Sequence, residues 1–125
     1  MYIDSTFYKK LEELHKRKFD WQTNNCGFFV GYMLQFMYGK DFLRDFIDKC
    51  KDKETSFDLI KQRGGWHNVL TNAGFTKRQD NSMYAGDVVI SENAIGISDG
   101  IKGLFAGGTY RSKEKITDVY YYTEK

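Results

Sequence analysis

The chain has 125 residues, of which 41% are hydrophobic and 17% aromatic, so it can form one buried core and is too apolar for an intrinsically disordered protein. Its 19 basic and 17 acidic residues leave a formal net charge of +2. This balance gives no overall attraction for nucleic acid or for an anionic membrane. We therefore expect a single domain over residues 1–125, without a nucleic-acid or membrane partner.

The longest apolar stretch lies within residues 26–38 and is too short and interrupted to cross a bilayer. No charged leader with an apolar core opens the sequence, which predicts a protein without a signal peptide. An intracellular location favours free thiols at Cys26 and Cys50 over a disulfide between them. Because neither the cysteines nor His15 and His67 have the spacing of zinc ligands, we expect no metal and no cofactor.

Helical periodicity dominates the first 80 residues. Residues 4–17 are typical of an amphipathic helix capped by Asp4 or Ser5, and the run from Cys26 to Gly39 is apolar on nearly every side, as in a central buried helix. Three shorter helices are expected after it. The first covers residues 41–50, and the second runs from about Ser56 to the glycine pair at 64–65, with an apolar stripe that includes Phe57. The third covers residues 66–73 and ends before Gly74.

Short runs rich in β-branched and aromatic residues follow residue 80, with glycines between them. These runs predict strands at residues 87–90, 94–98, 102–106 and 116–122. Asp99 and Gly100 suit a tight two-residue hairpin between the second and third strands, which favours an antiparallel meander. The order of helices first and a small antiparallel sheet second indicates an α+β fold whose buried central helix packs on the sheet.

Cys26 is the residue best placed for chemistry. It follows Asn24 and Asn25, either of which can cap the helix, so its sulfur is expected in the first turn near unpaired backbone N–H groups. That position favours the thiolate, which is the nucleophilic form of cysteine. The alternative interpretation of Cys26 is a small apolar residue inside a buried helix.

Three segments resemble the signature segments of the NlpC-type cell-wall peptidase superfamily, whose members have a papain-like fold. They are NNCGFFVGYML at residues 24–34, AGDVVI at 85–90 and AIGISDG at 94–100. The chain is similar, in addition, to small phage-encoded NlpC-like proteins of unknown function, which carry a Phe-x-Trp motif before the cysteine, as Phe19 and Trp21 do here. The resemblance implies a single papain-like domain.

The resemblance implies that Cys26 occupies the nucleophile position, that its amide can donate to an oxyanion, and that Asp87 shapes the start of the sheet. It also implies that Ala94 replaces the histidine that would deprotonate the cysteine. A third polar residue, expected near residues 104–106, is missing, and no histidine follows His67. Because a general base is typically worth a factor of about 10²–10⁴ in rate, this loss argues against peptidase activity.

Two histidines elsewhere in the chain could still supply a base. His67 is predicted in the last helix and His15 in the first, and either could instead be an ordinary interface or core residue. Glu92 and Asn93 lie beside the vacated position, where they either orient a water molecule or form a solvated turn.

Three functions remain open. The favoured hypothesis is a non-catalytic phage protein, associated with the virion or its tail, that binds other phage structural proteins. The first alternative is a cysteine hydrolase, a peptidoglycan endopeptidase or amidase, in which Cys26 and His67 are catalytic. The second is an inhibitor that binds a host protein in the host cytoplasm. Several aromatic residues and one arginine could contact a partner protein: Tyr110, Arg111 and the tyrosines at 120–122. Alternatively, they belong to an edge strand with alternating burial.

Overall fold

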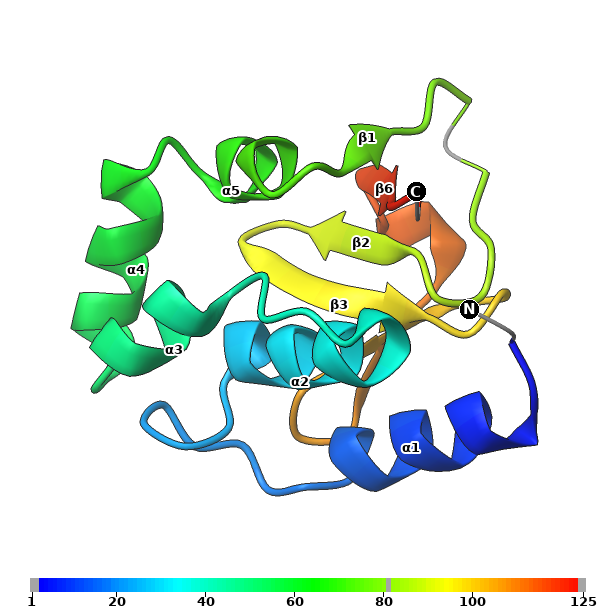
Figure 1. Cartoon of the computed structure of the whole chain (residues 1–125), viewed down its shortest axis with the longest axis horizontal. Coiled ribbons are helices and arrows are strands. Elements are labelled where there is room, and N and C mark those ends of the chain that lie inside the picture. Colours follow the sequence, from blue (N-terminus) through cyan, green and yellow to red (C-terminus); the bar gives the residue numbers. More distant parts are fainter. Residues whose placement is uncertain (1–2, 81, 124–125) are drawn as a thin grey trace.

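The structure is a computed structural model that describes residues 3–80 and 82–123. It is a mixed α+β fold, in which helices cover an antiparallel sheet (Figure 1). The helices are α1 (Ser5–His15), α2 (Cys26–Tyr38), α3 (Arg44–Lys49), α4 (Lys53–Gln62) and α5 (Trp66–Asn72). The strands are β1 (Thr76–Lys77), β2 (Val88–Ser91), β3 (Ala94–Ser98), β4 (Gly103–Phe105), β5 (Thr109–Arg111) and β6 (Asp118–Tyr121).

The first two helices begin where the sequence predicts, and α2 also ends where predicted, whereas α1 ends at His15 before the predicted end at residue 17. The Asp4 carboxylate accepts two backbone N–H groups of the first turn of α1. The side-chain oxygen of Asn25 accepts the N–H of Phe28, at 3.1 Å, and so caps α2. Gly39 ends α2 with φ of 69°, a left-handed conformation that costs glycine little. Local signals therefore determine both helices.

The next two helices differ from the prediction. Helix α3 is shorter than the predicted segment, and α4 begins at Lys53 instead of near residue 56 because Asp52 and Thr55 form a reciprocal capping box. The predicted apolar stripe of α4 is wrong at Phe57, whose surface is 44% exposed. This exposed ring becomes part of the candidate site below.

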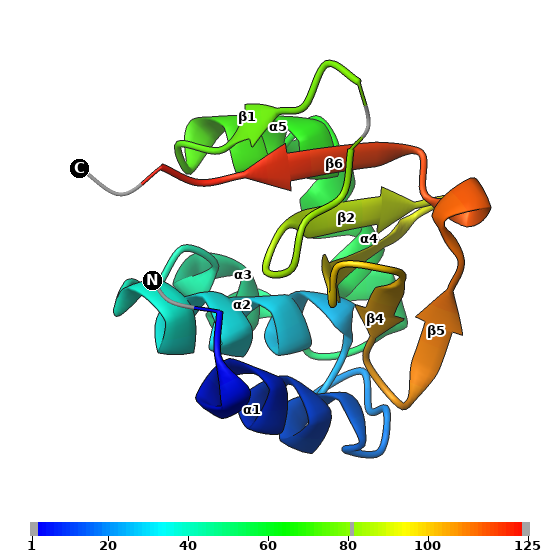
Figure 2. The ribbon, with the colours of Figure 1, turned by 90° about the vertical axis from the view of Figure 1, so that its right-hand side faces the viewer.

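The predicted antiparallel meander is confirmed for β2, β3 and β4, but it is wrong for the last strand, which returns to pair with β2. The strand order is β1-β6-β2-β3-β4-β5, and all neighbours are antiparallel (Figure 2). Strand β6 lies between β1 and β2, and the sequence analysis missed the short strands β1 and β5. The tyrosines at 120–122 consequently belong to an inner strand and the residue that follows it, and Tyr110 lies on the edge strand β5.

Two hairpins flank β3, and the second differs from the prediction. Strands β2 and β3 are joined by Glu92 and Asn93 alone, since Ser91 pairs with Ala94. The predicted two-residue turn between β3 and β4 is instead a four-residue loop at residues 99–102, whose first residue accepts two backbone N–H groups of the loop through its carboxylate.

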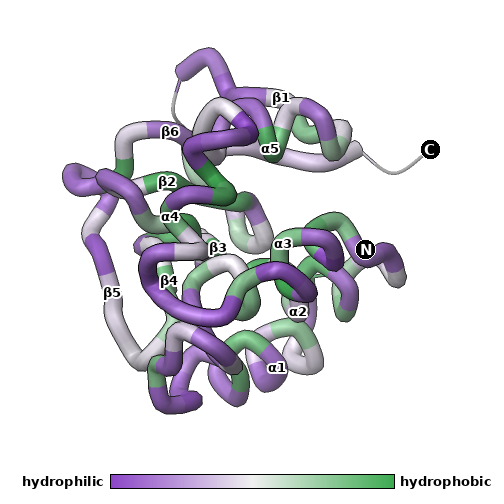
Figure 3. Tube along the Cα trace, turned by 90° about the vertical axis from the view of Figure 1, so that its left-hand side faces the viewer, coloured by the Kyte–Doolittle hydropathy of each residue, from purple (hydrophilic) through white to green (hydrophobic). Residues whose placement is uncertain are grey.

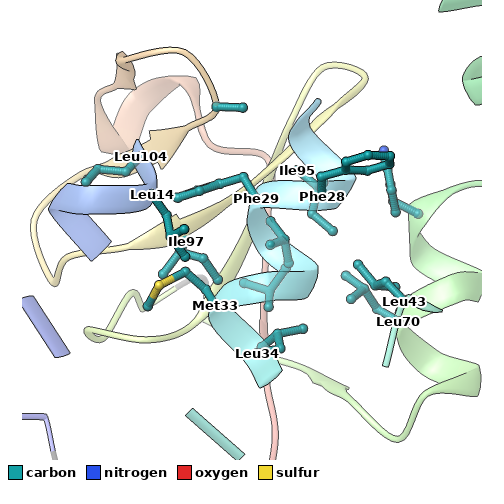
Figure 4. Packing of buried hydrophobic residues seen from close by; sticks show 14 of the residues in the cluster. Leu14, Phe28, Phe29, Met33, Leu34, Leu43, Leu70, Ile95, Ile97 and Leu104 are labelled. Atoms are coloured by element: carbon teal, nitrogen blue, oxygen red, sulfur yellow. The ribbon is translucent and has the colours of Figure 1, made fainter. Parts of the chain in front are cut away.

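Helix α2 lies across β3 and forms the centre of the core (Figure 4). Its Phe29 and Met33 are fully buried, and they lie beside Leu14 of α1 and Ile97 of β3. The colouring by hydropathy in Figure 3 shows α1 as a mixture of hydrophilic and hydrophobic segments, as expected for a helix with one buried face. Among the described residues, no helix is long and apolar enough to span a membrane.

Candidate functional site

A cavity of about 760 Å³ lies at the N-terminal end of α2. Its wall includes the first residue of α2, the turn between β2 and β3, the start of β3, parts of α4 and α5, and the residues around β4 and β5. The size is within the usual range for small-ligand sites. Among the residues predicted from sequence, the cavity brings together Cys26, His67, Glu92, Asn93 and Ala94.

Asn25 fixes the position of Cys26. Besides capping α2, its side-chain amide donates to the backbone oxygen of Trp21 at 3.0 Å and to the hydroxyl of Ser56 at 3.4 Å. The loop before α2, the helix itself and α4 are thereby joined at one buried side chain. Gly27 follows the cysteine because a Cβ atom there would lie 2.1 Å from the ring of Phe46.

Burial raises the pKa of the Cys26 thiol above its ordinary value, although the residue as a whole is only partly buried. The backbone N–H groups of Ile95, Gly27 and Cys26 itself oppose this shift without overcoming it, and the neighbouring Cys50 adds to it. Desolvation therefore outweighs the helix end, and the thiol is held in its protonated form near neutral pH. Both cysteines are free.

The Cys26 sulfur is close to the beginning of β3. The Ile95 amide acts on the thiol, and Ala94, the residue before it, lines the same cavity. A methyl group cannot accept a proton, so this stretch of β3 offers the thiol an amide donor and no base. Ala106, within the segment where a third polar residue was expected, also lines the cavity.

His67 lines the cavity, but its ring is engaged elsewhere. Its Nδ1 lies 2.5 Å from the hydroxyl oxygen of Tyr120, and its Nε2 lies 3.5 Å from a carboxylate oxygen of Asp118. Both ring nitrogens of His67 therefore face groups of β6. One of them would have to leave its partner before it could accept a proton from Cys26.

His15 lies behind the cavity wall, in the core. The side chain is 1% exposed, and its Nδ1 donates to the backbone oxygen of Phe105 at 2.8 Å. Its Nε2 is buried without a hydrogen-bond partner in the described part of the chain. The ring packs edge-on against Tyr110, so His15 attaches α1 to β4 and β5.

Aromatic side chains form one wall of the cavity. Phe19 packs edge-on against Trp21 at a centroid distance of 4.9 Å, and Trp21 packs in the same way against Phe57 at 5.5 Å. Phe19 is 38% exposed, so two of the three rings remain open to solvent. The Phe-x-Trp motif therefore lies at the cavity wall, and we call these three residues the aromatic wall.

Phe57, Ser91 and Trp66 were not predicted at this site, and Arg111 was considered only as a surface residue. Phe57 falls on the predicted apolar stripe of α4, so nothing in the sequence marked it as exposed. The others enter the cavity through the tertiary arrangement of the sheet. In the described residues, no group of three or more His, Cys, Asp and Glu side chains is placed to hold a metal ion.

Comparison with known proteins identifies a family but no characterised relative. A family model described as a domain of unknown function, DUF6950, matches residues 3–115. No curated protein matches the chain, and no solved structure matches it.

Proposed function

The chain belongs to the DUF6950 family, and we propose that it is a non-catalytic binding protein on a papain-like fold of the NlpC type, associated with a phage virion or tail. The cavity beside Cys26 corresponds in this proposal to the cleft of a peptidase that has lost its base. The observation that supports it most strongly is the environment of Cys26, where burial raises the thiol pKa and Ala94, which the resemblance matches to the catalytic histidine, lines the same cavity.

The order of the elements also supports the papain-like assignment. A cysteine opens the helix that packs on β3, and its sulfur is next to the first residues of that strand. Asp87, of the Gly-Asp pair, is 6% exposed and accepts both Arg78 Nε, at 2.7 Å, and the N–H of Tyr84, at 3.0 Å. It therefore holds the turn that leads into β2, as the resemblance implies.

A second function, a cysteine hydrolase, has one observation in its favour. Cys26 and His67 line the same cavity, and the backbone N–H groups of Ile95, Gly27 and Cys26 itself lie near the sulfur, in the region where an acyl oxyanion would form. The bonds from His67 to Tyr120 and Asp118 make it the weaker proposal, because one ring nitrogen would have to leave its partner on β6 and turn to Cys26 before the histidine could deprotonate the thiol.

A digestion assay separates the two functions. Wild-type protein and the Cys26→Ala variant are incubated with purified peptidoglycan, and soluble fragments are measured. Our proposal predicts equal, background release from both proteins. Release by the wild type that disappears in Cys26→Ala would overturn it in favour of a hydrolase.

The proposed location needs its own experiment. Mass spectrometry of purified phage particles from a lysate of cells that carry the gene should detect this chain in fixed proportion to the major structural proteins. Its absence from the particles, together with recovery in complex with a host protein, would favour the host-binding inhibitor instead.

A further inference from the structure

We infer that the cavity recognises an anionic ligand with an aromatic or other apolar body, about the size of a di- or tripeptide, and that Arg111 binds its carboxylate. This inference rests on the proposed binding function and names the class of ligand. It starts from a cationic side chain that lines the same cavity as the aromatic wall.

Arg111 is held along one edge. Its Nη1 donates to the hydroxyl of Ser91 at 3.0 Å, and Ser91, which is fully buried, in turn donates to the backbone oxygen of Lys115 at 2.6 Å. The guanidinium carbon lies 5.5 Å from the centroid of the Phe105 ring. A buried hydroxyl with a single available orientation thus fixes the arginine, which reduces the entropy lost when a ligand binds.

The remaining donors of Arg111 suit a carboxylate. In the described part of the chain, the hydrogen bonds of its side chain involve Nη1, which leaves Nε and Nη2 for a ligand. A guanidinium presents such donors as a planar fork that matches the two oxygens of a carboxylate. Glu92 is the competing anion, at 3.6 Å, but its side chain is 80% exposed and can move into solvent.

The balance of charge around the cavity favours the same class of ligand. Lys61 also lines the cavity and forms no ion pair with any described residue, whereas Glu92 is the one carboxylate among the described lining residues. The aromatic wall supplies an apolar surface for the rest of the ligand, and exposed rings at a cavity mouth are stabilised when a ligand covers them. A ligand with an anionic group on an apolar body can bind both the cationic side chains and the aromatic wall.

Two fluorescent probes test the inference. One is 1-anilinonaphthalene-8-sulfonate, an anionic aromatic dye, and the other is N-phenyl-1-naphthylamine, which has the same aromatic body without the charge. The wild type should bind the anionic dye, and Arg111→Gln should weaken that binding at least about tenfold while it changes the affinity for the neutral dye less than about twofold. Arg44→Gln, a change at an exposed arginine outside the cavity lining, is the matched control and should alter neither.

A competition experiment tests the carboxylate directly. N-acetyl-phenylalanine should displace the anionic dye at least about tenfold more effectively than its amide, and Arg111→Lys, which keeps the charge but not the fork, should lose most of this preference. Circular dichroism establishes that each variant is folded. If Arg111→Gln does not fold, Lys61→Gln, on an exposed face of α4, replaces it, and severalfold weaker binding of the anionic dye is expected.

The outcomes distinguish this inference from the function on which it rests. Two outcomes would show that the cavity does not select anionic ligands. One is that Arg111→Gln leaves the binding of both dyes unchanged, and the other is that the acid and the amide displace the dye equally well. In either case the cavity would still be a binding site. Failure of the wild type to bind either dye overturns the binding cavity itself, whereas the proposed function falls only if the chain is absent from purified phage particles or digests peptidoglycan through Cys26.

Discussion

The Nδ1 atom of His67 lies 2.5 Å from the hydroxyl oxygen of Tyr120, so the histidine that lines the cavity is bonded to β6 and not to Cys26. Burial raises the pKa of the Cys26 thiol, and His67 is held by Tyr120 and, on the other side of its ring, by Asp118.

Replacing His67 with alanine should leave the chemistry of Cys26 unchanged and reduce stability. The buried Tyr120 hydroxyl would lose its partner, which costs about 1 kcal/mol of the free energy of unfolding. Urea unfolding measures this loss, and Tyr120→Phe should be no further destabilising in the His67→Ala background. A tenfold drop in the alkylation rate of Cys26 in His67→Ala would instead identify His67 as its base.

Replacing Ala94 with histidine should activate Cys26. If Ala94 occupies the position of a lost base, an imidazole there can form an ion pair with the thiolate and lower its pKa. We expect the rate of iodoacetamide alkylation at pH 7 to rise at least about tenfold. Asn93→His adds the same side chain to the neighbouring turn and should have little effect. Equal rates in both variants would contradict the position assigned to Ala94.

Replacing Glu92 with glycine should stabilise the protein. Glu92 has φ of 55°, a left-handed conformation that costs a residue with a Cβ atom about 1 kcal/mol. Its ion pair with Arg111 contributes little because the carboxylate is exposed. Glycine should therefore raise the free energy of unfolding by about 1 kcal/mol, as measured by urea unfolding. Glu92→Ala keeps the Cβ atom and should give no gain, so a similar gain in both variants would contradict the explanation by strain.

Asp118 should contribute a stability that is lost in acid. Burial raises the pKa of its carboxyl, but the hydrogen bond and charge of Lys77 and the charge of His67 outweigh burial, so the folded pKa lies below its ordinary value. Such a group stabilises the fold above its unfolded pKa, about 3.9, and loses this contribution as pH falls through the lower folded value.

The difference in unfolding free energy between wild type and Asp118→Asn should accordingly be constant from pH 7 to 5 and shrink below pH 4. Urea unfolding at each pH measures it, and the Lys77→Met background should reduce the pH dependence, since Lys77 lies 2.8 Å from Asp118. A difference that does not change with pH would show that the carboxylate is unperturbed.

The parts of the fold that could be predicted are those with local causes. Helix α2 follows from its cap, its apolar run and Gly39, all within 15 residues of the chain. Strands β1 and β5 are two and three residues long, too short for a periodic pattern. Pairing with the distant β6 defines β1, whereas β5 pairs with the neighbouring β4. The pairing of β6 with β2 is also long-range, and the periodicity of the sequence does not predict it.

The same distinction holds for the site. The position of Cys26 at a helix start is a local property and was predicted. The bond from His67 to Tyr120 spans 53 residues, and the bond from Arg111 to Ser91 spans 20, so both depend on how α5 and the sheet come together. The residue types were visible in the sequence, whereas their partners were not.

The central claim is that the Cys26 thiol is not activated, and its pKa is the most direct test. Alkylation by iodoacetamide from pH 6 to 10, resolved by mass spectrometry of the peptides that contain Cys26 and Cys50, gives that pKa from the pH at which the rate is half-maximal. We predict a value above about 8.5, the ordinary pKa of a free cysteine. A value below about 7, with a rate at neutral pH above that of free cysteine, would contradict the account and indicate a working nucleophile.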